Sequence, residues 1–142
     1  MTMYHISIYD TYMPHLSQKE LDPKTKKEII QTFEMVLGKL NKSEAKEFLF
    51  SILSSTERTM LAKRLGVVTL LQEGVEDVDI SEALGVTRTT INRMQLFLNL
   101  RPRGFEIAKK KINEDKMMQV LKKNLVSLAS YALSASSGRV KF

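Results

Sequence analysis

Apolar residues recur along most of the chain with the three- and four-residue spacing of amphipathic helices. The first such stripe lies in residues 23–41, where Asp22 suits the N-cap and Pro23 the first helical position. Its apolar members are Ile29, Ile30, Phe33, Val36, Leu37 and Leu40. The pattern predicts one helix with a single apolar face, which must pack on something.

Two more helices are expected before the middle of the chain. Ser43 is a candidate cap for the second helix, whose apolar residues are Phe48, Leu49, Ile52 and Leu53. Ser54 and Glu57 have the spacing of a capping box that begins a third helix, and Gly74 suits its C-terminal end. The expected core face of the third helix consists of Met60, Leu61, Leu65, Val68 and Leu71.

Residues 77–98, DVDISEALGVTRTTINRMQLFL, predict two short helices joined by a tight turn. Asp77 is the expected cap of the first helix, and Gly85 suits a left-handed turn position. Thr87 is the expected cap of the second helix. The side chains expected to face the core are Ile80, Ala83, Leu84, Val86, Ile91, Met94 and Leu98. This pattern is typical of a helix-turn-helix.

Polar and cationic side chains occupy the outward half of the second motif helix: Thr87, Arg88, Thr89, Thr90, Asn92 and Arg93. Arg88 can bond a guanine bidentately, and Asn92 can bond an adenine. The threonines can contact bases or phosphates, and the helix N-terminus itself favours a phosphate. An ordinary helical hairpin with a solvated polar face is the alternative, but the capped polar helix and the turn glycine favour DNA binding.

The charge distribution supports the same interpretation. The chain has 22 basic and 16 acidic residues, a net charge of +6. Residues 87–111 contain seven basic residues and one acid, which accounts for the whole excess. Arg101 and Arg103 are therefore candidate phosphate contacts, as is the run from Lys109 to Lys111, although isolated runs of this kind are more often simply solvated.

After this basic segment the pattern predicts two C-terminal helices, over residues 105–112 and 114–133, with Asn113 as a cap and a frayed end after them. We interpret residues 1–21, which contain Pro14, as an N-terminal arm. Residues 22–100 form the predicted helical domain, and residues 101–142 a basic linker with C-terminal helices and a tail.

Several classes of function have no support in the composition. The chain has no cysteine, so disulfides and thiolate chemistry are excluded. His5 and His15 lie in the arm without a ligand series at metal spacing, and no catalytic constellation is found, so neither a metal site nor an enzyme is expected. No secretion signal or membrane-spanning run is recognised, and a cytoplasmic location is expected.

Extended upstream, the motif reads LSSTERTMLAKRLGVVTLLQEGVEDVDISEALGVTRTTINR. This segment resembles the Trp repressor superfamily, and the resemblance covers about residues 43–98. The motifs concerned are the Ser54-x-x-Glu57-Arg58 segment, Leu61, Lys63-Arg64, the Leu-Leu-x-x-Gly of residues 70–74, and Ile91-Asn92-Arg93.

The resemblance implies an all-α fold in which two subunits interlock, with a helix-turn-helix on each side of the homodimer. It implies sequence-specific binding of double-stranded DNA at a palindromic operator and regulation of transcription, with repression as the expected direction. The helical pattern alone leaves a monomeric core open.

In the tryptophan-sensing member of that superfamily, the corepressor lies beside residues that match Ser54, Arg64 and Arg93 of this chain. Met94 stands where that protein has a glycine, and Phe97 where it has a serine. Bulky side chains are therefore expected to fill the pocket, so we expect no cofactor and no tryptophan response. Arg64 and Arg93 would then contact phosphates or pair structurally.

Another departure lies in the first motif helix, which contains the acids Glu76, Asp77, Asp79 and Glu82. Acids that face DNA lower affinity, although some can complement the helix dipole. Two other interpretations therefore stay open. One is a helical protein-interaction module whose helix-turn-helix is degenerate and whose last helix docks a partner. The other is RNA binding through the basic segment, which shows no aromatic stacking platform.

Overall fold

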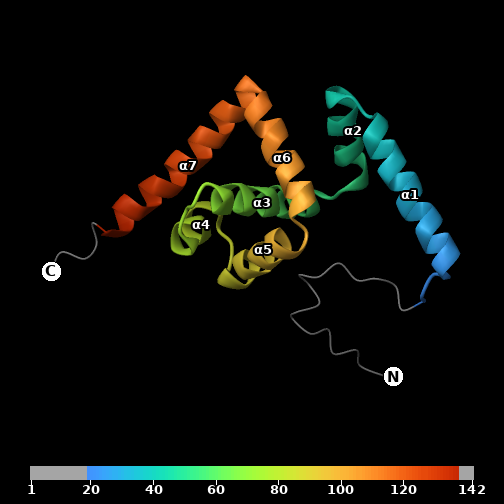
Figure 1. Ribbon diagram of the computed structural model, residues 1–142, viewed down its shortest axis with the longest axis horizontal. Coiled ribbons are helices and arrows are strands. Elements are labelled where there is room, and N and C mark those ends of the chain that lie inside the picture. The colour runs from blue at the N-terminus through green and yellow to red at the C-terminus, as the bar shows by residue number, and fades with distance from the viewer. Residues whose placement is uncertain (1–18, 138–142) are drawn as a thin grey trace. The chain divides into compact units, whose positions relative to one another are not determined.

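The computed structural model describes residues 19–137, which form seven α-helices and no strand, so the predicted all-α class is confirmed (Figure 1). The chain divides within α2 into two compact units, residues 1–48 and residues 49–142. The predicted arm lies mostly outside the described residues, as does the end of the predicted tail. The helices are α1 (Pro23–Lys39), α2 (Lys42–Ile52), α3 (Ser55–Gln72), α4 (Asp77–Leu84), α5 (Arg88–Leu100), α6 (Pro102–Glu114) and α7 (Lys116–Ser137).

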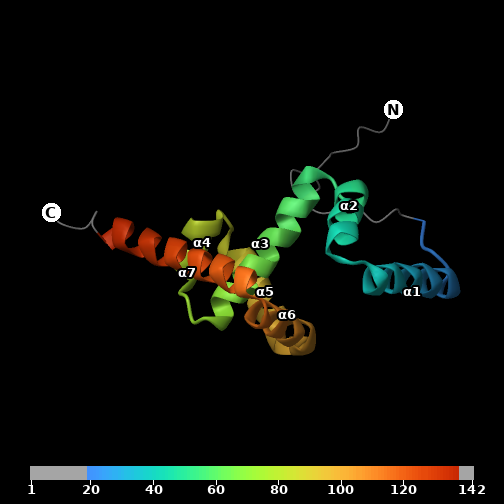
Figure 2. The same ribbon diagram turned by 90° about the horizontal axis from the view of Figure 1, so that it is seen from above.

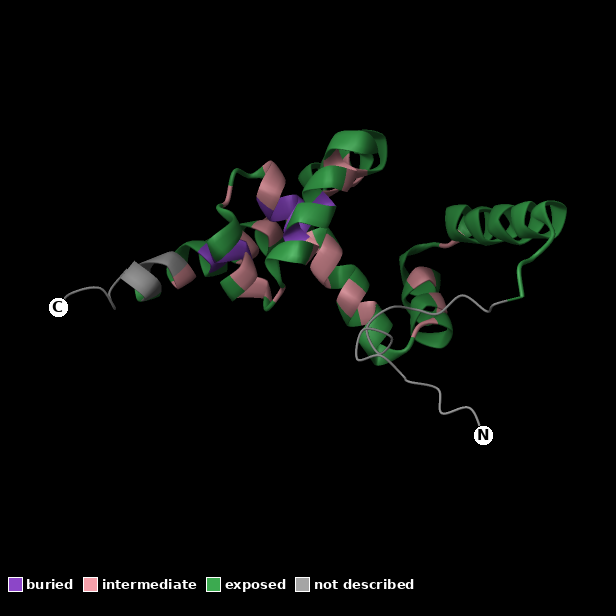
Figure 3. Ribbon diagram, turned by 90° about the horizontal axis from the view of Figure 1, so that it is seen from below, coloured by how far each residue is buried: buried purple, intermediate pink, exposed green. Residues whose placement is uncertain are grey.

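The start of α1 confirms the predicted cap. The Asp22 carboxylate accepts hydrogen bonds from the backbone N–H of Lys24 at 2.9 Å and of Thr25 at 3.3 Å. The Thr25 hydroxyl, followed by the Lys24 N–H, holds the pKa of Asp22 below its ordinary value. Every residue of α1 is exposed, as Figure 3 shows in green, and this includes the predicted apolar stripe apart from Leu40, which follows the helix and is half-buried.

The second helix begins earlier than predicted, and Ser43 is not its cap. The Asn41 side chain accepts a hydrogen bond from the N–H of Glu44 at 3.0 Å, and the Glu44 carboxylate accepts one from the N–H of Asn41 at 2.9 Å. This reciprocal pair satisfies two amides of the first turn. The pair forms around Asn41, which leaves Ser43 inside the first turn. Within the first unit, Phe48 of α2 faces Phe33 of α1 with ring centroids 6.0 Å apart.

Both predicted ends of α3 are confirmed. The Ser54 Oγ accepts from the N–H of Glu57 at 3.2 Å, and the Glu57 carboxylate accepts from the N–H of Ser54 at 2.8 Å. The bond from the Ser54 N–H, and next that from its hydroxyl, lowers the pKa of Glu57. Gly74 ends the helix with a φ of 77°, and the N–H of Val75 bonds back to the carbonyl of Leu70 at 3.0 Å.

The core of the second unit forms where α4, α5 and α7 meet α3. Its buried apolar residues are Val67, Val68, Leu70, Ile80, Ile91, Met94 and Ala129. The predicted core face of α3 is therefore only partly correct, since Leu61 and Leu65 are 48% and 46% exposed. The α3 helix has apolar residues on more than one side, and the other helices pack on the side of Val67 and Leu70.

The first motif helix also differs in its cap. Asp77 is the first residue of α4, and Glu76 stands at the N-cap without a side-chain cap bond. At the other end, Gly85 adopts the predicted left-handed conformation with a φ of 58°.

The C-terminal helices are longer than predicted. Pro102 begins α6, three residues before the predicted start, because a proline at the first position needs no amide donor. Asp115 replaces Asn113 as the cap of α7, accepting from the N–H of Met118 at 2.9 Å. The last helix continues to Ser137, so residues 134–137 are helical instead of frayed.

Figure 1 shows α6 and α7 as the two arms of a V that are joined at Asp115, and Figure 2 shows the same two helices from above. The α7 arm packs most extensively on α4. The Lys122 ammonium links α7 to the end of α3 and to α6, since it lies 3.2 Å from a carboxylate oxygen of Glu73 and 2.8 Å from the Asn113 side-chain oxygen. Among residues 19–137, no helix has the length and apolarity that a membrane crossing requires.

Candidate nucleic-acid interface

The turn between α4 and α5 is fixed by local hydrogen bonds. The Ser81 hydroxyl donates to the carbonyl of Val86 at 2.7 Å, and the N–H of Val86 donates to the carbonyl of Ser81 at 3.2 Å. Val86 is half-buried against the core, as predicted. These contacts hold the two helices at the close approach that a helix-turn-helix requires.

A long-range contact from α3 supports the same turn. The Lys63 ammonium donates to the carbonyl of Gly85 at 3.2 Å. One turn further along α3, a Cβ added to Gly66 would lie 3.1 Å from the Leu84 side chain, so the absence of a side chain there allows α3 and α4 to approach closely. Residues 63 and 85 are far apart in sequence, and no local pattern signals the contact.

The two sides of α5 have opposite surroundings. Ile91 is completely buried and Met94 is 3% exposed, and both belong to the core. The opposite side of the same turns is exposed, and it comprises Arg88, Thr89, Asn92 and Arg93. The predicted orientation of the second motif helix is thus confirmed for these four residues.

Two of the predicted DNA contacts are engaged within the helix cap. The Thr87 hydroxyl accepts from the N–H of Thr90 at 3.3 Å, and the two hydroxyl oxygens lie 3.2 Å apart. Thr87 is exposed and Thr90 is half-buried. Thr87 is therefore the cap of α5, as predicted, and these two hydroxyls first serve to fix the start of the helix.

The basic residues that follow lie on exposed surface. Arg101 stands between α5 and α6, with its guanidinium 4.9 Å from the centre of the Phe97 ring. A guanidinium stacked in this way keeps its N–H donors at the edge of its plane. Arg103 is exposed in the first turn of α6. At the other end of α6, Lys110 and Lys111 lie 3.7 and 4.0 Å from the Glu114 carboxylate.

The acids of α4 do not all face solvent. Glu76, Asp77 and Glu82 are exposed, whereas Asp79 is 4% exposed. Asp79 therefore does not lie on the surface that could contact a DNA backbone. Glu76 and Asp77 lie at the N-terminal end of α4, where a negative charge complements the helix dipole.

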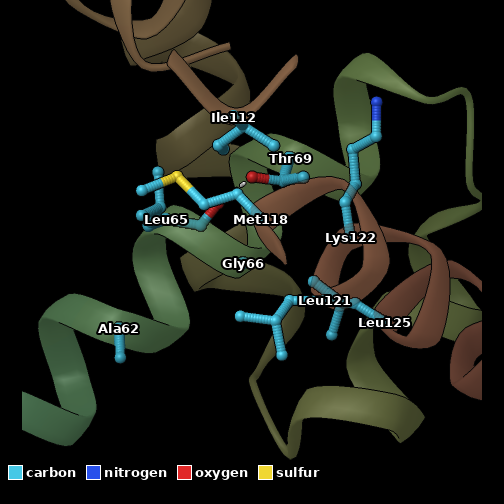
Figure 4. Close-up of a pocket in the computed structure, with 9 residues that line it drawn as sticks. All are labelled: Ala62, Leu65, Gly66, Thr69, Ile112, Met118, Leu121, Lys122 and Leu125. Carbon is cyan, nitrogen blue, oxygen red and sulfur yellow. Dashed lines mark hydrogen bonds between the residues drawn. The ribbon is translucent and has the colours of Figure 1, made fainter. Parts of the chain in front are cut away.

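The three candidate effector residues lie on different parts of the fold and have different surroundings. The Ser54 hydroxyl is occupied by the capping box with Glu57, Arg64 is half-buried on α3, and Arg93 is exposed on α5. A groove of about 510 Å³ has none of the three in its lining (Figure 4). Its lining comes from α3, α6 and α7: Ala62, Leu65, Gly66, Thr69, Ile112, Met118, Leu121, Lys122 and Leu125.

In residues 19–137, histidine and acidic side chains form no cluster of three that could hold a metal ion. His5 and His15 lie outside the described residues.

Comparison with known proteins identifies the family. A family model described as Trp repressor protein matches residues 27–123, more than half of the chain. The match runs from α1 into α7 and contains the whole helix-turn-helix. No curated protein and no solved structure matches the chain. The chain belongs to the Trp repressor family, whose members are helix-turn-helix DNA-binding regulators.

Proposed function

We propose that the protein binds double-stranded DNA sequence-specifically as a homodimer and represses transcription. The main support is the exposed side of α5, which presents Arg88, Asn92 and Arg93 to solvent while Ile91 and Met94 fix its other side in the core. A rigid helix with exposed donors near its N-terminus matches what the major groove accepts.

Each exposed residue has a distinct proposed role. Arg88 bonds a guanine and Asn92 an adenine, because those pairings are bidentate. Thr89 and Arg93, on the same side of α5, contact base edges or the adjacent backbone. Thr87 and Thr90 hold the start of the helix, whose unpaired amides favour a phosphate.

Arg101 and Arg103 extend the contact along the DNA backbone. They follow α5 directly, and both are exposed. The α4 helix presents three exposed acids instead, so electrostatic attraction depends on α5 and on the start of α6. We expect affinity to be modest and strongly dependent on salt concentration.

The homodimer is supported by apolar surface that is exposed on each of the two units. The stripe on α1 is exposed along its whole length, and so are Leu61 and Leu65 on α3. Burying apolar surface contributes about 25 cal/mol per Å². A second copy that covers these faces would present two recognition helices about one DNA turn apart, which suits a palindromic operator.

The test begins with selection of bound fragments from a random duplex library, followed by binding measurements at two salt concentrations. Wild-type protein should enrich a palindromic site. Arg88→Ala should relax preference at one base pair of each half-site by about 1–3 kcal/mol. Lys109→Ala, on the exposed face of α6, is the matched control and should weaken binding to all sequences equally. Equal selectivity of wild type and Arg88→Ala would contradict the role of Arg88.

The same measurements separate the alternatives. Preference for structured RNA over the selected duplex would favour an RNA-binding protein. Failure to bind any duplex in dilute buffer would favour a protein-interaction module. Phe33→Glu, which places a charge in the exposed stripe of α1, should convert dimer to monomer in light scattering if that face forms the dimer. Repression itself is tested by placing the selected site upstream of a reporter gene.

A further inference from the structure

The polar surface of α5 continues beyond the residues to which a role has been given. Gln95 and Asn99 are both exposed, and the Gln95 side-chain nitrogen donates a hydrogen bond to the Asn99 side-chain oxygen across 3.2 Å. They follow Arg88 by seven and eleven residues, which is close to two and three whole turns of a helix. Gln95 and Asn99 therefore continue the line along which α5 presents Arg88. We name these two residues the amide pair.

The amide pair and Arg101 lie on opposite flanks of α5. The Arg101 guanidinium stacks on the ring of Phe97 and so lies on the Phe97 side of the helix. Phe97 is two residues from Gln95 and two from Asn99, and two residues correspond to about 200° around a helix. The major groove is about 12 Å wide, close to the diameter of a helix with its side chains, so a sugar-phosphate backbone runs along each flank of a helix bound there.

Position along α5 separates the amide pair from the residues proposed to read bases. A rise of about 1.5 Å per residue places Gln95 about 10 Å beyond Arg88, and Asn99 further still. The major groove is about 8.5 Å deep. When the N-terminal half of α5 reaches the base edges, the amide pair therefore lies near the level of the phosphates.

The hydrogen bond within the amide pair favours a phosphate over a base as its ligand. This bond occupies the Asn99 oxygen, whereas bidentate pairing with adenine uses the oxygen and the nitrogen of one amide together. Because both side chains are exposed, the second hydrogen of the Gln95 nitrogen and both hydrogens of the Asn99 nitrogen can donate outward. A phosphate oxygen only accepts hydrogen bonds, so it matches this set of donors.

We propose that the amide pair binds a phosphate of the DNA backbone on the flank of α5 opposite Arg101. The recognition helix is then held between the two backbones of the groove, by a cation on one flank and by neutral amides on the other. This inference rests on the proposed function and adds a contact of a different kind. A neutral amide displaces no counterion, so the pair contributes affinity without adding to the salt dependence of binding.

Alanine variants of the full-length protein test the contact on the duplex that wild type selects and on a duplex of scrambled sequence. Gln95→Ala and Asn99→Ala should each weaken binding to both duplexes by about tenfold. The slope of log affinity against log salt concentration should stay at the wild-type value. Asn124→Ala removes an exposed amide from α7 and is the matched control, which should keep wild-type affinity. Circular dichroism should show wild-type helicity for all three variants.

Lysine at position 95 separates a phosphate contact from a base contact. Gln95→Lys restores a donor and adds a charge, so it should bind at least as tightly as wild type in dilute buffer and steepen the salt slope by about 0.9. Wild-type affinity for Gln95→Ala, a loss confined to one base pair of the site, or an unchanged slope for Gln95→Lys would overturn the inference and leave the proposed function standing. Failure of the wild-type protein to bind any duplex would overturn both.

Discussion

The ammonium of Lys63 donates a hydrogen bond to the carbonyl of Gly85 across 3.2 Å and so joins α3 to the turn of the helix-turn-helix. The carbonyl belongs to the residue in the left-handed conformation between α4 and α5. Since the direction in which α5 leaves the turn depends on that residue, Lys63 influences where the exposed side of α5 points without itself lying on that side.

Replacing Lys63 with methionine should destabilise the turn and leave the rest of the fold in place. The lost bond is solvent-accessible, so we expect the free energy of unfolding to fall by about 1 kcal/mol. Hydrogen exchange of the amides of residues 85 and 86 should accelerate. Lys109→Met removes the same charge from exposed surface and should leave both quantities unchanged. Similar losses in the two variants would show that the Lys63 contact contributes nothing specific.

Replacing Gly85 with alanine should destabilise the protein through backbone strain and without a steric clash. A Cβ there would lie 3.6 Å from the Lys63 nitrogen, an ordinary contact, but the φ of 58° is unfavourable for any residue with a side chain. We expect Gly85→Ala to lower the free energy of unfolding by about 1–2 kcal/mol. Gly104→Ala is the control, because it stands in α6 with open space around it. It should raise stability by up to about 1 kcal/mol.

Features formed by nearby residues could be predicted from the sequence. The capping box of Ser54 and Glu57 and the turn at Gly85 each depend on residues within one or two turns, and the structure confirms both. The sequence predicts Ser43 as the cap of α2, whereas the reciprocal hydrogen bonds with Glu44 make Asn41 the cap. Helix ends are in general the least certain part of such a prediction.

Contacts between distant segments could not be predicted. Lys122 and Glu73 are far apart in the sequence, as are Lys63 and Gly85, and no local sequence pattern predicts either contact. The prediction of which α3 residues face the core is partly wrong for a related reason. Apolar residues lie around much of α3, and the packing of α4 and α5 decides which of them become buried.

The capping box of α3 should give stability a measurable dependence on pH. Because hydrogen bonds from Ser54 lower the pKa of Glu57 in the folded protein, the folded state binds that proton less readily than the unfolded state. The resulting stabilisation is present above the ordinary glutamate value of 4.5 and is lost as the pH falls through the lowered value. Unfolding of wild type and Glu57→Gln, measured from pH 7 to pH 3, should differ most at neutral pH and converge in acid.

The opposite trend, a difference that grows in acid, would contradict the assignment. Glu106→Gln removes an exposed carboxylate from α6 and is the control for the general effect of charge. Its unfolding should follow that of wild type across the whole pH range.

L-tryptophan should have no effect on this protein. Met94 is buried in the core, and Phe97 packs against that core beneath the Arg101 guanidinium, so bulky side chains stand at the two positions where the tryptophan-sensing member has a glycine and a serine. Titration calorimetry should give no saturable heat with L-tryptophan, and DNA affinity should be the same with and without it. Saturable binding would contradict the expectation that Met94 and Phe97 block the pocket.

Ala129 of α7 shares one core with Ile80 of α4 and Ile91 of α5. We therefore expect that the helix-turn-helix of this protein cannot fold correctly when it is moved to another protein without α3 and α7. A chimaera that transplants only residues 77–98 onto another scaffold would leave that core open on the side that α7 closes. The smallest segment that can be exchanged between proteins runs from the start of α3 through Ala129.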